Sequence, residues 1–101
     1  MDIPQIMTAI DPTGPGGPEV LELVERPVPQ PASGEVLIRV AAAGVNRPDV
    51  LQRRGMYPPP KGAPTIPGLE IAGEVVAVGE RVDSIYLGQK VCALVSGGGY
   101  A

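Results

Sequence analysis

The apolar positions of this chain recur in short runs that predict strands. From Glu35 to Ala43, Val36, Ile38 and Val40 share one face while Leu37 and Arg39 share the other. Alternation of this kind over four to eight residues is typical of a half-buried strand. The same pattern predicts further strands over residues 3–10, 19–28, 69–79 and 90–95, with Leu21 and Leu23 on the buried face of the second.

The segments between these runs carry turn signals. Residues 11–18 (DPTGPGGP) predict a turn, alternating prolines at 27–31 predict an extended connector, and residues 58–68 predict a rigid loop at the surface. Gly73 suggests a bulge or bend inside its strand. A proline-rich connector also resembles a polyproline ligand, but a stiff link between strands is the commoner explanation and is the one we favour.

One short helix is predicted near residues 46–54. Asn46 is a suitable N-cap, Pro48 lies just inside the helix start, and Asp49 falls in the first turn, where the helix dipole favours a carboxylate. Arg53 falls in the last turn, and Gly55 is the expected C′ residue. The sequence therefore predicts a mainly β fold with a single helix.

Composition limits the size and the environment of the fold. The 101 residues suffice for one domain, and 14 Gly with 13 Pro argue against a helix bundle. The only cysteine, Cys92, lies in an apolar strand, which predicts a small core residue, and it has no partner for an internal disulfide. Without a signal-peptide pattern, the simplest compartment is a reducing cytoplasm.

Charge and residue types exclude several functions. A net charge of −3 gives no reason to expect nucleic-acid binding, and no apolar run approaches the length of a membrane span. Histidine is absent, so any chemistry must use carboxylates, Tyr, hydroxyls or a cofactor. The glycine-rich stretches at 11–18 and 97–99 lack the following helix that a phosphate-binding loop requires.

Four stretches together carry a family resemblance: GGPEVLEL, GEVLIRVAAAGVNRPDVLQRRGMYPPPKGAP, GLEIAGEVVAVGE and KVCALVSGGGYA. They resemble the zinc-independent NADPH:quinone oxidoreductases of the medium-chain dehydrogenase/reductase superfamily, in particular the p53-inducible quinone oxidoreductase branch, whose N-R-x-D-x-x-Q-R-x-G-x-Y pattern begins here at Asn46. Nearly the whole chain takes part in this resemblance.

The resemblance implies a GroES-like, partly open β-barrel that belongs to a catalytic domain. In that family a separate Rossmann domain holds NADPH, and residues 1–101 have no counterpart of it. We therefore expect this chain to be the N-terminal part of a truncated catalytic domain, inactive by itself and without bound NADPH. The sequence is compatible with both a monomer and a homo-oligomer.

The resemblance also implies that no metal is bound. Zinc-dependent relatives carry a Cys and a His at positions that correspond here to Asn46 and Leu69, while Gly68 and Glu70 of the G-H-E motif are kept. A catalytic zinc needs about three protein ligands, so two substitutions argue against it.

Site residues follow from the same resemblance. Tyr57 and Asn46 are the expected catalytic residues, and Asn46, Asp49 and Arg53 are expected to face the cofactor. Each has a simpler explanation: Asn46 as a helix cap, Asp49 as a dipole partner and Tyr57 as a ring packed on prolines. The cluster of Arg47, Arg53, Arg54 and Lys61 could contact a cofactor phosphate, but a solvated helix face is the explanation we favour.

Two functions stay open. The first is hydride transfer from NADPH to a quinone or related enone in a full-length protein, where the protein orients the two rings. The second is a non-enzymatic GroES-like binding or oligomerisation module that acts through unpaired strand edges.

Overall fold

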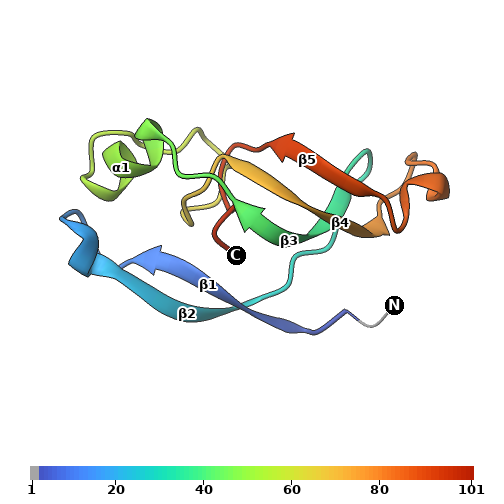
Figure 1. Cartoon of the computed structure of the whole chain (residues 1–101), viewed down its shortest axis with the longest axis horizontal. Helices are drawn as coiled ribbons and strands as arrows, with labels where there is room; N and C mark the ends of the chain where they lie inside the picture. Colours follow the sequence, from blue (N-terminus) through green and yellow to red (C-terminus); the bar gives the residue numbers. More distant parts are fainter. Residues whose placement is uncertain (1–2) are drawn as a thin grey trace.

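The computed structural model describes residues 3–101, which form two separate antiparallel sheets and one α-helix (Figure 1). The first sheet contains β1 (Ile6–Pro12) and β2 (Leu21–Pro27); the second, in the order β3-β4-β5, contains β3 (Val36–Ala43), β4 (Glu70–Val78) and β5 (Lys90–Leu94); α1 spans Arg47–Arg53, and the single-turn 3-10 helices η1 and η2 span Pro18–Val20 and Ser84–Tyr86. Within these residues the sheets form no closed barrel and no Rossmann unit, which confirms a mainly β, partial barrel.

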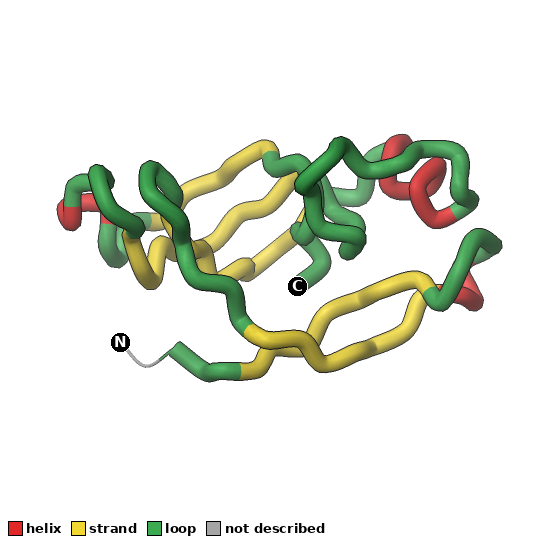
Figure 2. The backbone as a smooth tube through the Cα atoms, turned by 180° about the vertical axis from the view of Figure 1, so that it is seen from behind, coloured by secondary structure: helices red, strands yellow, loops and turns green. Residues whose placement is uncertain are grey.

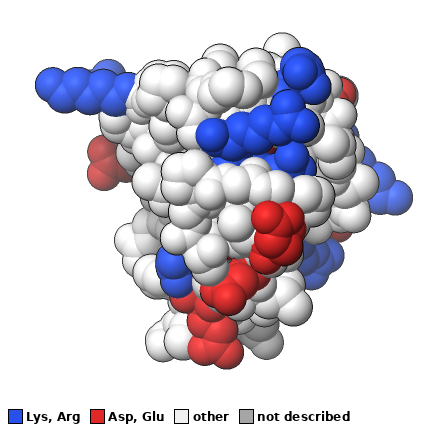
Figure 3. Space-filling model, turned by 90° about the vertical axis from the view of Figure 1, so that its left-hand side faces the viewer, with Lys and Arg blue, Asp and Glu red and all other residues white. Residues whose placement is uncertain are grey.

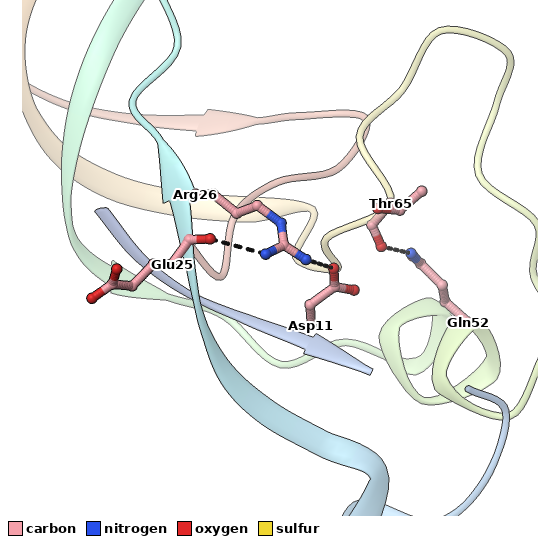
Figure 4. Close-up of polar contacts among 5 residues, drawn as sticks. All are labelled: Asp11, Glu25, Arg26, Gln52 and Thr65. Carbon is pink, nitrogen blue, oxygen red and sulfur yellow. Dashed lines mark hydrogen bonds and ion pairs between the residues drawn. The ribbon is translucent and has the colours of Figure 1, made fainter. Parts of the chain in front are cut away.

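The β1–β2 ribbon departs from the predicted strand limits. β1 begins at Ile6 and continues to Pro12, so the predicted turn at Asp11 is wrong, because Asp11 pairs with Glu22 in the ladder. Its carboxylate also lies 3.1 Å from the Arg26 guanidinium (Figure 4). β2 starts at Leu21 rather than Glu19, since residues 18–20 form a 3-10 turn.

The ribbon turns the opposite face inward from the one predicted. Ala9 is 1% exposed and pairs with Val24, so these residues mark the inner face. Leu23 pairs with Ile10 on the other face and is 74% exposed. Leu21 and Leu23 therefore share a face as expected, but that face is exposed.

The three-stranded sheet contains two bulges, and neither is centred on Gly73 as predicted. An extra residue, Ala41, lies on β3 opposite the Gly73 region, and a second, Val76, lies on β4. Gly73 is needed for a different reason: a Cβ there would collide with the Arg39 carbonyl oxygen of the neighbouring strand. The glycine permits close backbone approach, and the bulges supply the bending.

The core is small and includes part of a loop predicted to be at the surface. The buried apolar residues are Ala9, Ile66, Ile71 and Val75. Ile66 ends the proline-rich loop, and Pro67 and Gly68 after it are buried as well, so that prediction is wrong for this end. The Gly98 N–H donates to Ile66 O at 2.7 Å, and the Tyr100 N–H donates to Pro67 O at 3.0 Å.

Cys92 is exposed, which corrects its predicted place in the core. It pairs with Ala72 on the outer face of the sheet, while its neighbours Val91 and Ala93 point inward. The exposure of Cys92 therefore follows from strand alternation. The apolar composition of a strand does not show whether its odd-numbered or its even-numbered residues face the core.

The chain end lies between the two layers. Both Figure 1 and Figure 2 show the C-terminus in the space between the ribbon and the larger sheet. The Ile10 N–H donates to Tyr100 O at 2.8 Å, which links the last residues to β1. Residues 97–101 therefore connect the ribbon to the rest of the fold.

Candidate functional site at the start of helix α1

The predicted cap of α1 is confirmed. Asn46 occupies the N-cap with extended backbone angles, and its N–H donates to Asp49 Oδ2 at 2.8 Å. The Asp49 N–H in turn donates to Asn46 O at 3.0 Å. These bonds close the first turn at the point where β3 leads into the helix.

The end of α1 is also built as predicted. Gly55 has a φ of +80° at C′, its N–H donates to Gln52 O at 3.0 Å, and the Met56 N–H donates to Leu51 O at 2.8 Å. This pair of bonds is a Schellman motif. Gln52 Nε2 also donates to Thr65 O at 2.9 Å, which joins the helix to the far end of the loop that carries Tyr57 (Figure 4).

Asp49 is the buried centre of the site, with 5% of its surface exposed. Besides the Asn46 N–H, its Oδ2 accepts the Tyr100 hydroxyl at 2.9 Å. Its other oxygen, Oδ1, is buried and has no hydrogen-bond partner among the described residues. Burial and the neighbouring Asp49 carboxylate raise the pKa of Tyr100 to about 12.

A second polar pair lies beside this buried centre. Asn46 Nδ2 donates to Glu70 Oε1 at 3.0 Å, and both residues are exposed. Glu70 opens β4, and its carbonyl accepts the Gly44 N–H at 2.9 Å, which fixes the chain on both sides of the pair. The pair offers an amide and a carboxylate that solvent or a ligand can reach.

Sequence reasoning missed Glu70 and Tyr100 as members of this site. The only sequence signal for Glu70 is that it retains the Glu of a G-H-E motif whose His position is occupied by Leu69. Tyr100 gave no signal, because its partner Asp49 is 51 residues away in sequence. Only the path of residues 97–101 brings the two together.

The remaining predicted residues, Arg53 and Tyr57, do not join these hydrogen bonds. Arg53 Nε donates to Gly16 O at 3.1 Å, and the Gly16 N–H donates to Arg53 O at 3.0 Å, so Arg53 holds the 11–18 loop. Tyr57 is 36% exposed, and no hydrogen bond to it is found among residues 3–101. Figure 3 views this end of the molecule and shows Lys and Arg side chains gathered above Asp and Glu.

Two hollows in the molecule lie away from these residues. The larger, about 1240 Å³, lies between the ribbon and β3 and is lined partly by residues 97–99. Neither hollow is lined by Asn46, Asp49, Arg53 or Tyr57. In the described part of the chain, no group of three His, Cys, Asp or Glu side chains lies close enough together to hold a metal ion. The helices among residues 3–101 lack the length and the apolar composition of a membrane span.

Comparison with known proteins gives consistent results. Residues 32–100 match the family described as "Alcohol dehydrogenase GroES-like domain". A quinone oxidoreductase from Lama guanicoe is 44% identical over 97 residues, which cover 93% of this chain and 29% of that protein.

Solved structures show the same fold. The human synaptic vesicle membrane protein VAT-1 homolog-like protein superimposes with a TM-score of 0.84 at 36% identity, over 94% of this chain and 31% of that one. Mycobacterial Rv1454c complexed with NADPH gives 0.75 at 40% identity, over 87% and 27% of the two chains. This chain thus spans less than a third of the length of these relatives.

Proposed function

Because the chain belongs to the alcohol dehydrogenase GroES-like domain family, we propose that it forms the substrate side of the active cleft of an NADPH-dependent quinone oxidoreductase. The observation that carries the proposal is the exposed Asn46 amide, held at 3.0 Å by Glu70 where zinc-dependent relatives place a metal ligand. An amide in that place supplies a hydrogen-bond donor or acceptor to an uncharged carbonyl substrate.

Each residue then has a separate role. Asn46 and Tyr57 orient the quinone, with the Tyr57 phenol donating to the oxygen that gains negative charge. Asn46, Asp49 and Arg53 face the cofactor side, and Asp49, being 5% exposed, acts by holding Asn46 and the helix start. NADPH, when bound, supplies the hydride.

Three finer statements belong to the same proposal. The activity is independent of zinc, the protein works in the cytoplasm, and residues 1–101 alone neither bind NADPH nor reduce quinones. We propose that residues 1–101 alone do not bind NADPH because they are assigned to the substrate side of the cleft. They supply no glycine-rich turn followed by a helix N-terminus that could hold the pyrophosphate.

The test is a chimera. Residues 1–101 replace the matching segment of the Lama guanicoe quinone oxidoreductase, and NADPH-dependent quinone reduction is measured. Replacing Tyr57 by Ala should lower kcat/KM by roughly a hundred- to a thousandfold, as for the loss of one charge-stabilising donor. Tyr86→Ala is the control, since Tyr86 lies in η2 and not in the proposed site. Equal turnover of the two variants would refute the role of Tyr57.

A second candidate, a binding or oligomerisation module, is favoured by a different observation. The chain exposes many large apolar side chains, among them Leu94 at 85%, Leu23 at 74% and Ile6 at 57%. Where exposed apolar side chains form a contiguous patch, the patch is typical of a contact with another protein. This candidate does not depend on the enzymatic one.

A further inference from the structure

Gly44 and Glu70 lie opposite each other where β3 ends and β4 begins. The last residue of β3, Ala43, pairs with Ile71, and the Gly44 N–H donates to Glu70 O at 2.9 Å. The ladder therefore continues for one residue beyond the end of β3. Residues opposite each other in such a ladder normally have neighbouring side chains. Because Gly44 has none, the space beside its Cα is open to the side chain of Glu70.

The Glu70 carboxylate fills this space. A Cβ at Gly44 would collide with Glu70 Oε1 and would lie 2.9 Å from Glu70 Cδ and 3.4 Å from Asn46 Nδ2. Gly44 is not one of the glycines with a positive φ, so its backbone conformation does not require glycine. Glycine is required at this position because the carboxylate occupies the place of a side chain.

The position of the carboxylate determines how the Asn46 amide is turned. Glu70 Oε1 accepts a hydrogen bond from Asn46 Nδ2 at 3.0 Å. Since an ionised carboxylate only accepts hydrogen bonds, the amide must turn its NH₂ group, and not its oxygen, toward Glu70. The side-chain oxygen of Asn46 then belongs to the capping box with the Asp49 N–H. The second N–H of the Asn46 amide is left for a ligand.

We propose that Gly44 and Glu70 are positioning residues that hold the Asn46 side chain as a hydrogen-bond donor. The site then selects substrates that present an acceptor, such as the ring carbonyl oxygen of a quinone or enone. Gly44 provides the space, Glu70 binds one N–H of the amide, and the second N–H meets the substrate oxygen. This inference rests on the proposed function, in which Asn46 orients the substrate.

The first test uses the chimera with the Lama guanicoe enzyme. Gly44→Ala should lower kcat/KM for the quinone about tenfold or more, because its methyl group displaces the carboxylate and Asn46 loses a hydrogen bond to a charged group. Glu70→Leu should have the same effect, whereas Glu70→Gln, whose side-chain oxygen still accepts from Asn46, should keep most of the activity. Gly14→Ala is the matched control, because a Cβ there meets nothing within 4 Å.

A double variant separates positioning from a general loss of structure. If Gly44 acts through Asn46, adding Gly44→Ala to Asn46→Ala should lower kcat/KM no further. Additive effects of the two substitutions, or a Gly44→Ala chimera as active as the unmodified one, would overturn the inference. An Asn46→Ala chimera with full activity would instead refute the substrate contact on which the proposed function depends.

Proton NMR of the 101-residue chain tests the positioning without measuring activity. In the original chain, one Asn46 side-chain N–H proton should lie downfield of the other, because it is bonded to a carboxylate. Gly44→Ala should remove this difference, and Gly14→Ala should preserve it. Asn46 side-chain resonances that Gly44→Ala leaves unchanged would contradict the positioning role, whatever the kinetics of the chimera.

Discussion

Asp49 is the residue on which the polar contacts of the site converge. Its Oδ2 accepts both the Asn46 N–H and the Tyr100 hydroxyl, so one buried carboxylate joins the helix start to the end of the chain. When a buried carboxylate loses a hydrogen-bond donor, the desolvation cost of the carboxylate is no longer offset and the folded state is destabilised. The position of Asn46 therefore depends on Tyr100, with which it has no direct hydrogen bond.

Replacing Tyr100 by Phe should lower the free energy of unfolding by about 1–3 kcal/mol, because Asp49 loses a buried hydrogen bond. Urea denaturation measures the change. Tyr86→Phe is the control, since Tyr86 is 47% exposed, and it should change stability by less than about 0.5 kcal/mol. Equal effects of the two substitutions would contradict the structural role of the Tyr100 hydroxyl.

The same hydroxyl gives a pH dependence with a definite sign. The Tyr100 pKa rises from 10.0 to about 12 on folding, so the unfolded chain ionises first as pH increases. Stability from this group is complete below pH 10 and is lost as pH rises toward about 12. The free energy of unfolding measured across this range should fall as pH rises in the original chain. The fall per pH unit should be smaller in Tyr100→Phe.

At the scale of elements, the pairing of β3 with β4 determines the position of the site. α1 follows β3 and Glu70 opens β4, so the Asn46–Glu70 distance depends on the register between these strands. Gly73 lies in the same ladder and allows the Arg39 carbonyl to approach closely. A side chain at that position forces the strands apart.

Gly73→Ala should lower the free energy of unfolding by about 2 kcal/mol or more, since its methyl group meets backbone that cannot rotate away. Gly14→Ala is the matched control, because a Cβ there meets nothing within 4 Å, and it should be nearly neutral. Thermal unfolding of the two variants separates them. Similar melting temperatures would show that the strands absorb the methyl group.

At the scale of the whole molecule, residues 3–101 form a small core, in which Ala9, Ile66, Ile71 and Val75 are buried together with Pro67. The larger hollow between the two sheets, about 1240 Å³, leaves the inner face of β3 partly uncovered. A fold with so little burial has a small margin of stability. Any contact that covers its surface should therefore stabilise it measurably.

The sequence by itself determined the mainly β class, the helix near residues 46–54, both of its caps and the family. These features depend on local patterns: alternation, N-cap and C′ residues, and ordered motifs in which Asn46 and Gly55 are recognisable without any distant neighbour. Sequence patterns also placed Asn46 and Asp49 in one polar cluster, because both lie within a single helical turn.

Only the tertiary structure decided which faces are buried and what completes the cluster. Alternation shows that Leu21 and Leu23 share a face, but a strand's inner face is chosen by what packs against it, and so Cys92 and both leucines are exposed. Tyr100 reaches Asp49 across 51 residues, and no local pattern records a contact of that separation. Long-range packing depends on many residues together and not on one local pattern. It brings Tyr100 to Asp49 and so completes the site.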